Sequence, residues 1–146
     1  MMDQKVFPAE IDSLYAMLEF IKDYGQNHPI SPTALDQIIL AAEEALVNII
    51  SYGYPDKKKG TIEIACQEST SKAGIKIVIK DQGIPFNPIE NAPTELPPSS
   101  VLEKSENSLG GYGIYILIGL MDRVEYQRID GGNMLSLTKY SENQSL

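Results

Sequence analysis

Apolar side chains recur at helical spacing in two segments of the first third of the chain. Residues 9–26 predict one amphipathic helix, with repeating apolar positions at Ile11, Leu14, Tyr15, Leu18 and Ile21. Residues 32–52 predict a second helix, because Ser31 can cap its N-terminus, Pro32 suits its first turn and Gly53 can end it. A broad apolar arc of this second helix is expected to face the core: Leu35, Ile38, Ile39, Ala42, Ala45, Leu46, Ile49 and Ile50.

Alternating apolar and polar residues predict four longer strands. Residues 61–68 and 74–81 alternate and are joined by a short turn, which predicts a hairpin. Residues 123–129 and 134–139 predict a second hairpin around the turn sequence DGGN. Residues 5–7 form a further short extended piece. Helices grouped around antiparallel hairpins predict an α+β fold, a two-layer sandwich.

A long polar segment, residues 87–109, separates the two hairpins. It contains four of the nine prolines and shows little periodicity. Loops of this length in compact domains are usually functional lids or linkers. Because this segment lies between two glycine-containing motifs and not between two domains, we favour a lid. A buried helix over about residues 112–121 is predicted to follow it.

A polar stripe interrupts the apolar sequence EEALVNIISYGYP, residues 43–55. Winding the predicted helix at about 100° per residue brings four polar side chains together between apolar edges: Gln37, Glu44, Asn48 and Ser51. Glu43 falls on another stripe and is expected to be exposed. The polar stripe is either a solvated helix face or one side of a ligand pocket, because burying an unpaired carboxylate is costly. The helix alone leaves both interpretations open.

The sequence DQGIPF, residues 81–86, follows a predicted strand. It can be a strand terminator with a proline turn, or it can be part of a binding site. In the second interpretation Asp81 accepts a hydrogen bond from the exocyclic amine of a base, and Gly83 lets the backbone approach the ring.

A glycine-rich motif, LGGYGIYILIGLMD, covers residues 109–122. Glycines before an apolar helix can present free main-chain N–H groups to phosphates, and Gly110, Gly111 and Gly113 suit that role. The motif does not fit the dinucleotide fingerprint, because Ile116 occupies the third glycine position, and the GK[ST] of a P-loop is missing. These two nucleotide-binding folds are therefore excluded.

Taken in order, EEALVN, DQGIPF and GGYGIYIL resemble the N, G1 and G2 boxes of the GHKL ATPase superfamily, which includes gyrase, heat-shock chaperones and histidine kinases. The EALVN spacing and the segments GIPFNP, GIYILIGLMDRVEY and GGNMLSLTK are similar, more narrowly, to the bacterial anti-sigma factor serine/threonine kinases. The resemblance covers roughly residues 5–140. It implies a two-layer sandwich of the GHKL, or Bergerat, type, with helices on one face of a mixed, mostly antiparallel sheet.

The resemblance implies a role for each box. Asn48 would offer its amide oxygen to Mg²⁺, a hard cation that prefers oxygen ligands. Glu44, one turn earlier, would orient or deprotonate the attacking hydroxyl as the catalytic residue. Asp81 would bind the adenine of ATP, with Gly83 beside it. The glycines of the third box would hold the phosphates: Gly110, Gly111 and Gly113.

The implied function is an ATP- and Mg²⁺-dependent kinase that phosphorylates a serine or threonine of an antagonist protein, and binds or releases a sigma factor according to the state of that protein. Two alternatives stay open: a module that binds ATP and a partner with little or no transfer, and a stand-alone histidine-kinase-like ATPase. A homodimer is compatible with all three. Family members commonly have a histidine where this chain has Tyr52. Lys104, the only basic residue of the expected lid, is a candidate phosphate contact.

The length, net charge and residue composition of the chain limit its domain number, its location and the classes of partner it can bind. A length of 146 residues suits one domain, residues 1–146. The net charge of −8 argues against a nucleic acid or an anionic membrane as the main partner. With no membrane-length apolar run and no signal-peptide pattern at the start, we expect a cytoplasmic protein. The single His28 and the single Cys66 exclude a histidine metal cluster and an internal disulfide.

Overall fold

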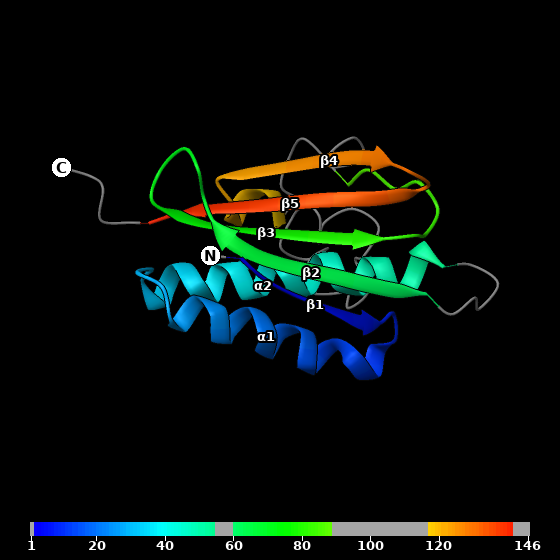
Figure 1. The fold of residues 1–146 in the computed structure, drawn as a ribbon, viewed down its shortest axis with the longest axis horizontal. Coiled ribbons are helices and arrows are strands. Elements are labelled where there is room, and N and C mark those ends of the chain that lie inside the picture. The colour runs from blue at the N-terminus through cyan, green and yellow to red at the C-terminus, as the bar shows by residue number, and fades with distance from the viewer. Residues whose placement is uncertain (1, 55–59, 89–116, 142–146) are drawn as a thin grey trace, which may run out of the picture.

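Five strands form one antiparallel sheet in the computed structural model, which describes residues 2–54, 60–88 and 117–141 (Figure 1). The strands are β1 (Asp3–Pro8), β2 (Thr61–Glu68), β3 (Gly74–Asp81), β4 (Arg123–Ile129) and β5 (Gly132–Tyr140). Their order across the sheet is β1-β2-β3-β5-β4. Both predicted hairpins, β2–β3 and β4–β5, are confirmed, and the short extended piece near the N-terminus is a six-residue edge strand.

The two predicted helices are also present. After the 3-10 turn η1 (Ile11–Ser13), α1 covers Leu14–Gln26 and α2 covers Pro32–Asn48. The Ser31 hydroxyl caps α2, because its Oγ accepts a hydrogen bond of 3.0 Å from the main-chain N–H of Ala34. A π-helical turn, η2 (Ile49–Gly53), extends α2 and ends at the predicted glycine. π-Turns of this kind often occur at functional sites.

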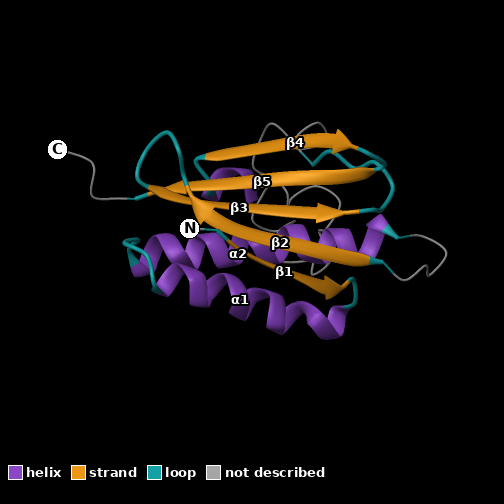
Figure 2. Cartoon of the chain, in the orientation of Figure 1, coloured by secondary structure: helices purple, strands orange, loops and turns teal. Residues whose placement is uncertain are grey.

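The core lies between the helices and one face of the sheet. Figure 1 and Figure 2 show α1 and α2 side by side on the same side of the five strands. Alternate residues of each central strand point toward the helices and are buried among apolar side chains of α1 and α2. The fully buried large side chains are Met17, Ile21, Ile38, Leu46, Ile62, Ile64, Ile77, Ile79, Leu117 and Leu137. The predicted two-layer α+β sandwich with helices on one face is confirmed.

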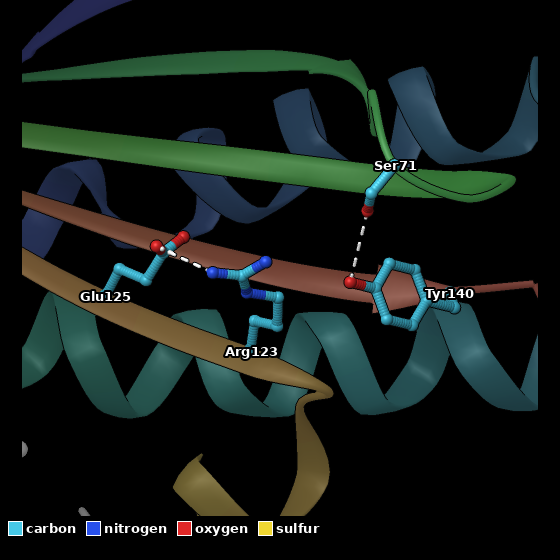
Figure 3. Close-up of polar contacts among 4 residues, drawn as sticks. All are labelled: Ser71, Arg123, Glu125 and Tyr140. Atoms are coloured by element: carbon cyan, nitrogen blue, oxygen red, sulfur yellow. Dashed lines mark hydrogen bonds and ion pairs between the residues drawn. The ribbon is translucent and has the colours of Figure 1, made fainter.

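The sheet register brings separate motifs to one end of the sheet. Asp81, the last residue of β3, lies opposite Ile62 of β2 and opposite Asn133 of β5. The other end holds surface contacts between side chains: Arg123 pairs with Glu125 at 3.0 Å, and Ser71 lies 3.3 Å from the Tyr140 hydroxyl (Figure 3). Exposed ion pairs such as the one between Arg123 and Glu125 contribute about 1 kcal/mol or less.

Some predicted features fall outside the described residues. The expected lid, its Lys104 and the three glycines of the third motif lie outside them, apart from residues 87 and 88 at the start of that segment. Of the helix predicted over residues 112–121, the structure describes residues 117–121, and residues 117–120 are helical. Within the part of the chain that is described, no helix has the length and apolar character needed to cross a membrane.

Candidate nucleotide-binding site

A pocket between the end of α2 and the end of the sheet brings two of the predicted site residues together. Asn48 of α2 and Asp81 of β3 both line it, although they lie 33 positions apart in the sequence. The other lining residues come from α2, the η2 turn, the segment after β3, residue 117 and the β4–β5 hairpin, and most are apolar: Ala45, Ile49, Gly53, Ile84, Phe86, Pro88, Leu117, Tyr126, Asn133 and Leu135. An apolar pocket with a few convergent polar groups is typical of a small-molecule site.

Asn48 presents a polar atom that no described residue satisfies. The residue is 3% exposed, and its Nδ2 donates to the main-chain carbonyl oxygen of Glu44 at 3.0 Å. This hydrogen bond sets the orientation of the amide and leaves Oδ1 buried without a hydrogen-bond partner among the described residues. Buried polar atoms nearly always have a partner, and an amide oxygen is a suitable ligand for Mg²⁺. The Oδ1 atom of Asn48 therefore fits a bound cation.

Glu44 lies one turn before Asn48 on α2 and does not line the pocket itself. Its side chain is half-buried, and its Oε2 atom is buried without a hydrogen-bond partner among the described residues. Burial, and to a lesser degree the negative charge of Glu43, raise the pKa of the Glu44 carboxyl. A carboxylate with a raised pKa is a better proton acceptor. Glu43 itself is exposed, as predicted.

The polar stripe of α2 is only partly buried. Gln37, two turns before Glu44, also carries a buried oxygen, Oε1, without a partner in the described part of the chain. Ser51 and Tyr52 are exposed. Within the described part of the chain, three of the four stripe residues thus hold oxygens without a hydrogen-bond partner along one face of the helix. This is unusual for a solvated surface and favours the pocket interpretation.

Asp81 is 4% exposed and is held by its own loop. Its Oδ1 accepts a hydrogen bond of 2.8 Å from the main-chain N–H of Gly83. Gly83 has no room for a side chain: an added Cβ would lie 2.3 Å from the carbonyl oxygen of Gly53. The glycine of the DQG motif is therefore required by the close approach of its backbone to Gly53. The approach of Gly83 to a base stays a prediction.

The backbone of the first motif contacts the backbone of the second. The main-chain N–H of Ile84 donates to the carbonyl oxygen of Gly53 at 2.9 Å. Beside it, the Tyr54 hydroxyl accepts from the main-chain N–H of Gln82 at 2.8 Å and donates to the carbonyl oxygen of Thr61 at 2.9 Å. These bonds fix how far Asn48 and Asp81 lie from each other across the pocket.

Sequence analysis missed three residues of this site: Tyr126, Arg128 and Asn133. The sequence predicts Asn133 in the DGGN turn, but the structure places it in β5, opposite Asp81, where its Nδ2 donates to the Asp81 carboxylate at 2.9 Å. Tyr126 lines the pocket, and Arg128 donates to the carbonyl oxygen of Gly83 at 2.7 Å. The residue type gave no signal for this position, because Asn is common in turns and depleted in strands.

The chain is similar to a known domain family and to a solved structure. The family model of the histidine kinase-like ATPase domain matches residues 7–139 of the chain. Among solved structures, the RsbU and RsbW domains of a Mycobacterium tuberculosis protein match with a TM-score of 0.65, over 96% of this chain and 32% of that chain. Because the sequence identity is only 15%, this likeness concerns the fold alone.

Curated proteins of similar sequence include two bacterial kinases. The serine/threonine-protein kinase BtrW of Bordetella bronchiseptica is 28% identical over 74% of this chain and 72% of its own length. The serine-protein kinase RsbW of Bacillus licheniformis is 32% identical over 73% of this chain. The matched part covers 65% of that RsbW, which is less than two thirds of its length.

Proposed function

Because the chain belongs to the histidine kinase-like ATPase domain family, we propose that it binds ATP and transfers phosphate to a serine or threonine of an antagonist protein, as an anti-sigma regulatory kinase. The resemblance stated from the three boxes is confirmed at the level of the family and its GHKL-type fold. The names of the curated relatives support kinase activity within the family. The observation that carries the proposal is the shared pocket: Asn48, whose Oδ1 has no hydrogen-bond partner among the described residues, and Asp81 both line it.

The pocket chemistry suits the two ends of a nucleotide. At the Asp81 end, Ile84 and Phe86 line the pocket and offer apolar surface to a base, while the carboxylate can accept a hydrogen bond from its amino group. At the other end, Asn48 Oδ1 suits Mg²⁺, which is usually held by one or two protein oxygens together with phosphates. We therefore assign adenine to Asp81 and the metal to Asn48, with Gly110, Gly111 and Gly113 proposed to hold the phosphates.

Phosphate transfer would depend on the positioning of ATP and the incoming hydroxyl, and on one proton acceptor, Glu44. When bound, Mg²⁺ supplies positive charge that offsets the charge of the phosphates. Glu44 accepts the proton of the incoming serine or threonine hydroxyl while the hydroxyl oxygen bonds to the γ-phosphorus. The bond between the γ-phosphorus and the bridging oxygen breaks, and ADP leaves with both electrons of that bond. The raised pKa of Glu44 favours this use of the carboxylate.

One observation favours a second candidate, an ATP-dependent binding module without transfer. The pocket is lined by Asn48 and Asp81, but not by Glu44. A chain that held ATP in this pocket without presenting Glu44 to a hydroxyl would still bind and release partners. The two candidates differ only in whether phosphate reaches a partner.

The test is capture of partners from the native cytoplasm with immobilised protein, in the presence of Mg²⁺ with ATP or with ADP. We expect an antagonist protein, and a sigma factor, to be retained in a nucleotide-dependent way, and the antagonist to gain phosphate from γ-labelled ATP. Asn48→Ala should lose the nucleotide dependence. Asp36→Ala, an exposed change on the same helix, is the matched control and should behave as wild type. Absence of Mg²⁺-dependent ATP binding by the wild type would overturn the proposal.

A further inference from the structure

Asn133 is buried, with 8% of its surface exposed, and its side-chain amide forms hydrogen bonds through both its NH₂ group and its oxygen. Its Nδ2 donates to Asp81 Oδ1 at 2.9 Å and to the carbonyl oxygen of Ile84 at 2.8 Å. Its Oδ1 accepts from the Tyr126 hydroxyl, from Arg128 Nη1 at 3.3 Å and, more weakly, from the main-chain N–H of Phe86 at 3.4 Å. Both amide hydrogens and the amide oxygen are therefore used.

These partners permit only one orientation of the amide. Asp81 Oδ1 and the carbonyl oxygen of Ile84 can only accept, so both require the NH₂ side of Asn133. Arg128 can only donate, so it requires the oxygen side. A flipped amide would place oxygen against two acceptors. The network fixes Asn133 and, through it, the segment from Asp81 to Phe86.

The network also decides which oxygen of Asp81 stays available. Oδ1 accepts from Gly83 N at 2.8 Å and from Asn133 Nδ2 at 2.9 Å, so its two lone pairs are in use. No hydrogen bond between described residues reaches Oδ2. Because Asp81 lines the pocket, Oδ2 is the oxygen that a ligand can use.

We propose that Asn133 is a positioning residue that fixes the Asp81 carboxylate, so that a single acceptor oxygen faces the pocket and selects a base carrying an exocyclic amino group over one carrying a carbonyl. This inference rests on the proposed function, since it takes a nucleotide as the ligand. A site built around one fixed acceptor rejects a carbonyl at the same position, because two acceptors face each other without a proton between them. The β4–β5 hairpin thus sets base selection at the end of β3.

Arg128 and Tyr126, both from β4, support Asn133 through hydrogen bonds to its Oδ1 atom. Arg128 Nη1 also donates to the carbonyl oxygen of Gly83 at 2.7 Å, so one guanidinium contacts both the loop and the amide that holds the loop. Arg128 is an exposed residue, whereas Asn133 is buried. Removing the Arg128 contacts should therefore cost less than removing the Asn133 amide.

The test compares Mg²⁺-ATP and Mg²⁺-GTP binding by calorimetry in the wild type and in Asn133→Ala. The amide bonds a charged carboxylate, so the variant should bind ATP about tenfold to a hundredfold more weakly, and its preference for ATP over GTP should shrink. Arg128→Met should shift both quantities in the same direction by a few fold. Gln127→Ala, an exposed change on the same strand, is the control and should bind as wild type.

Asn133→Asp should make ATP binding depend on pH, which a general loss of stability would not do. At pH 7.5 the new carboxylate would face the Asp81 carboxylate on one side and Arg128 on the other. Arg128 offsets part of the repulsion, but the hydrogen bond to Asp81 is lost, so ATP binding should be weak. Toward pH 5.5 the pair can share one proton, because adjacent carboxyls hold a proton more tightly, and ATP binding should recover in part. Neither the wild type nor Asn133→Ala should show this recovery.

The possible outcomes distinguish a wrong role for Asn133 from a wrong proposed function. If the wild type binds ATP and Asn133→Ala keeps the same affinity and the same preference over GTP, the inference is wrong and the proposed function stands. Wild-type-like behaviour of Arg128→Met together with pH-independent binding by Asn133→Asp would overturn it as well, even if Asn133→Ala does not fold. Failure of the wild type to bind ATP would overturn both.

Discussion

The main-chain N–H of Ile84 donates a hydrogen bond of 2.9 Å to the carbonyl oxygen of Gly53. This bond joins the end of the η2 turn to the loop that follows β3, and so joins the Asn48 side of the pocket to the Asp81 side. Gly83 lies directly against the same carbonyl. The shape of the pocket therefore depends on backbone contacts as much as on the side chains that line it.

Gly83→Ala should destabilise the protein. An added Cβ would lie 2.3 Å from the carbonyl oxygen and 2.8 Å from the carbonyl carbon of Gly53, and backbone atoms cannot yield as a flexible side chain does. Overpacking of this kind costs about 1 to 3 kcal/mol. Chemical denaturation measures the loss. Gly119→Ala, where no atom lies within 4 Å of the added Cβ, is the control; equal stability of the two variants would contradict the tight approach.

Asp81→Asn should weaken ATP binding without unfolding the chain. The amide oxygen can still accept from Gly83 and Asn133, which leaves an NH₂ group directed at the ligand where the carboxylate oxygen was. Loss of a hydrogen bond to a charged group costs about 1.5 to 3 kcal/mol, or roughly tenfold to a hundredfold in affinity. The measurement is ATP affinity by calorimetry, with circular dichroism to show that the variant is folded. Unchanged ATP affinity in a folded variant would show that Asp81 is not part of the site.

Glu44→Gln should raise the free energy of unfolding at neutral pH. Burial raises the pKa of Glu44 in the folded state above its unfolded value, so folding disfavours the ionised form. The penalty is absent below the unfolded pKa, where the carboxyl is protonated in both states, and reaches its full size above the folded pKa. The stability gain of the variant should therefore be largest near pH 7 and vanish toward pH 3. A gain that does not change with pH would contradict this account.

Cys66 should resist thiol reagents in the folded protein. It is buried in β2, and burial, with a smaller effect from Asp3, raises its pKa to about 12. Because only the thiolate reacts readily, modification should require unfolding and should accelerate with denaturant. The measurement is the rate of reaction with an aromatic disulfide reagent. Rapid, complete reaction under native conditions would show that the β2 region opens freely.

The secondary structure could be predicted from the sequence because its signals are local. The alternation of residues 61–68 and 74–81, the Ser31 cap and the breaking Gly53 each act within a few positions, and all agree with the structure. The meeting of Asn48 and Asp81 is not local. Spacing along α2 shows that Asn48 lies on a polar stripe, but only the family resemblance indicated that Asp81 would share its pocket.

The role of Asn133 could not be predicted because it depends on hairpin register. The sequence predicts a four-residue turn over DGGN, whereas among its four residues only Asp130 and Gly131 have the positive φ values, 50° and 78°, that a two-residue turn requires. β5 therefore begins at Gly132, two residues earlier than predicted. This register places Asn133 beside the Asp81 carboxylate.

In the proposed function Glu44 is the proton acceptor and Asn48 is a metal ligand, so variants at the two positions should lose different properties. Asn48→Ala should lose Mg²⁺-dependent ATP binding together with transfer. Glu44→Ala should keep ATP affinity within a few fold, because the carboxylate does not line the pocket. It should also still bind its partner and act as a constitutive inhibitor, since it can no longer phosphorylate the antagonist.

The most direct measurement is the single-turnover rate of phosphate transfer from γ-labelled ATP to the captured antagonist, run for wild type and Glu44→Ala with both proteins saturated by nucleotide. Loss of a positioned general base typically lowers such a rate by about 10² to 10⁴. We predict a loss in that range with ATP affinity retained. Transfer at the wild-type rate by Glu44→Ala would contradict the assignment of Glu44 as the proton acceptor.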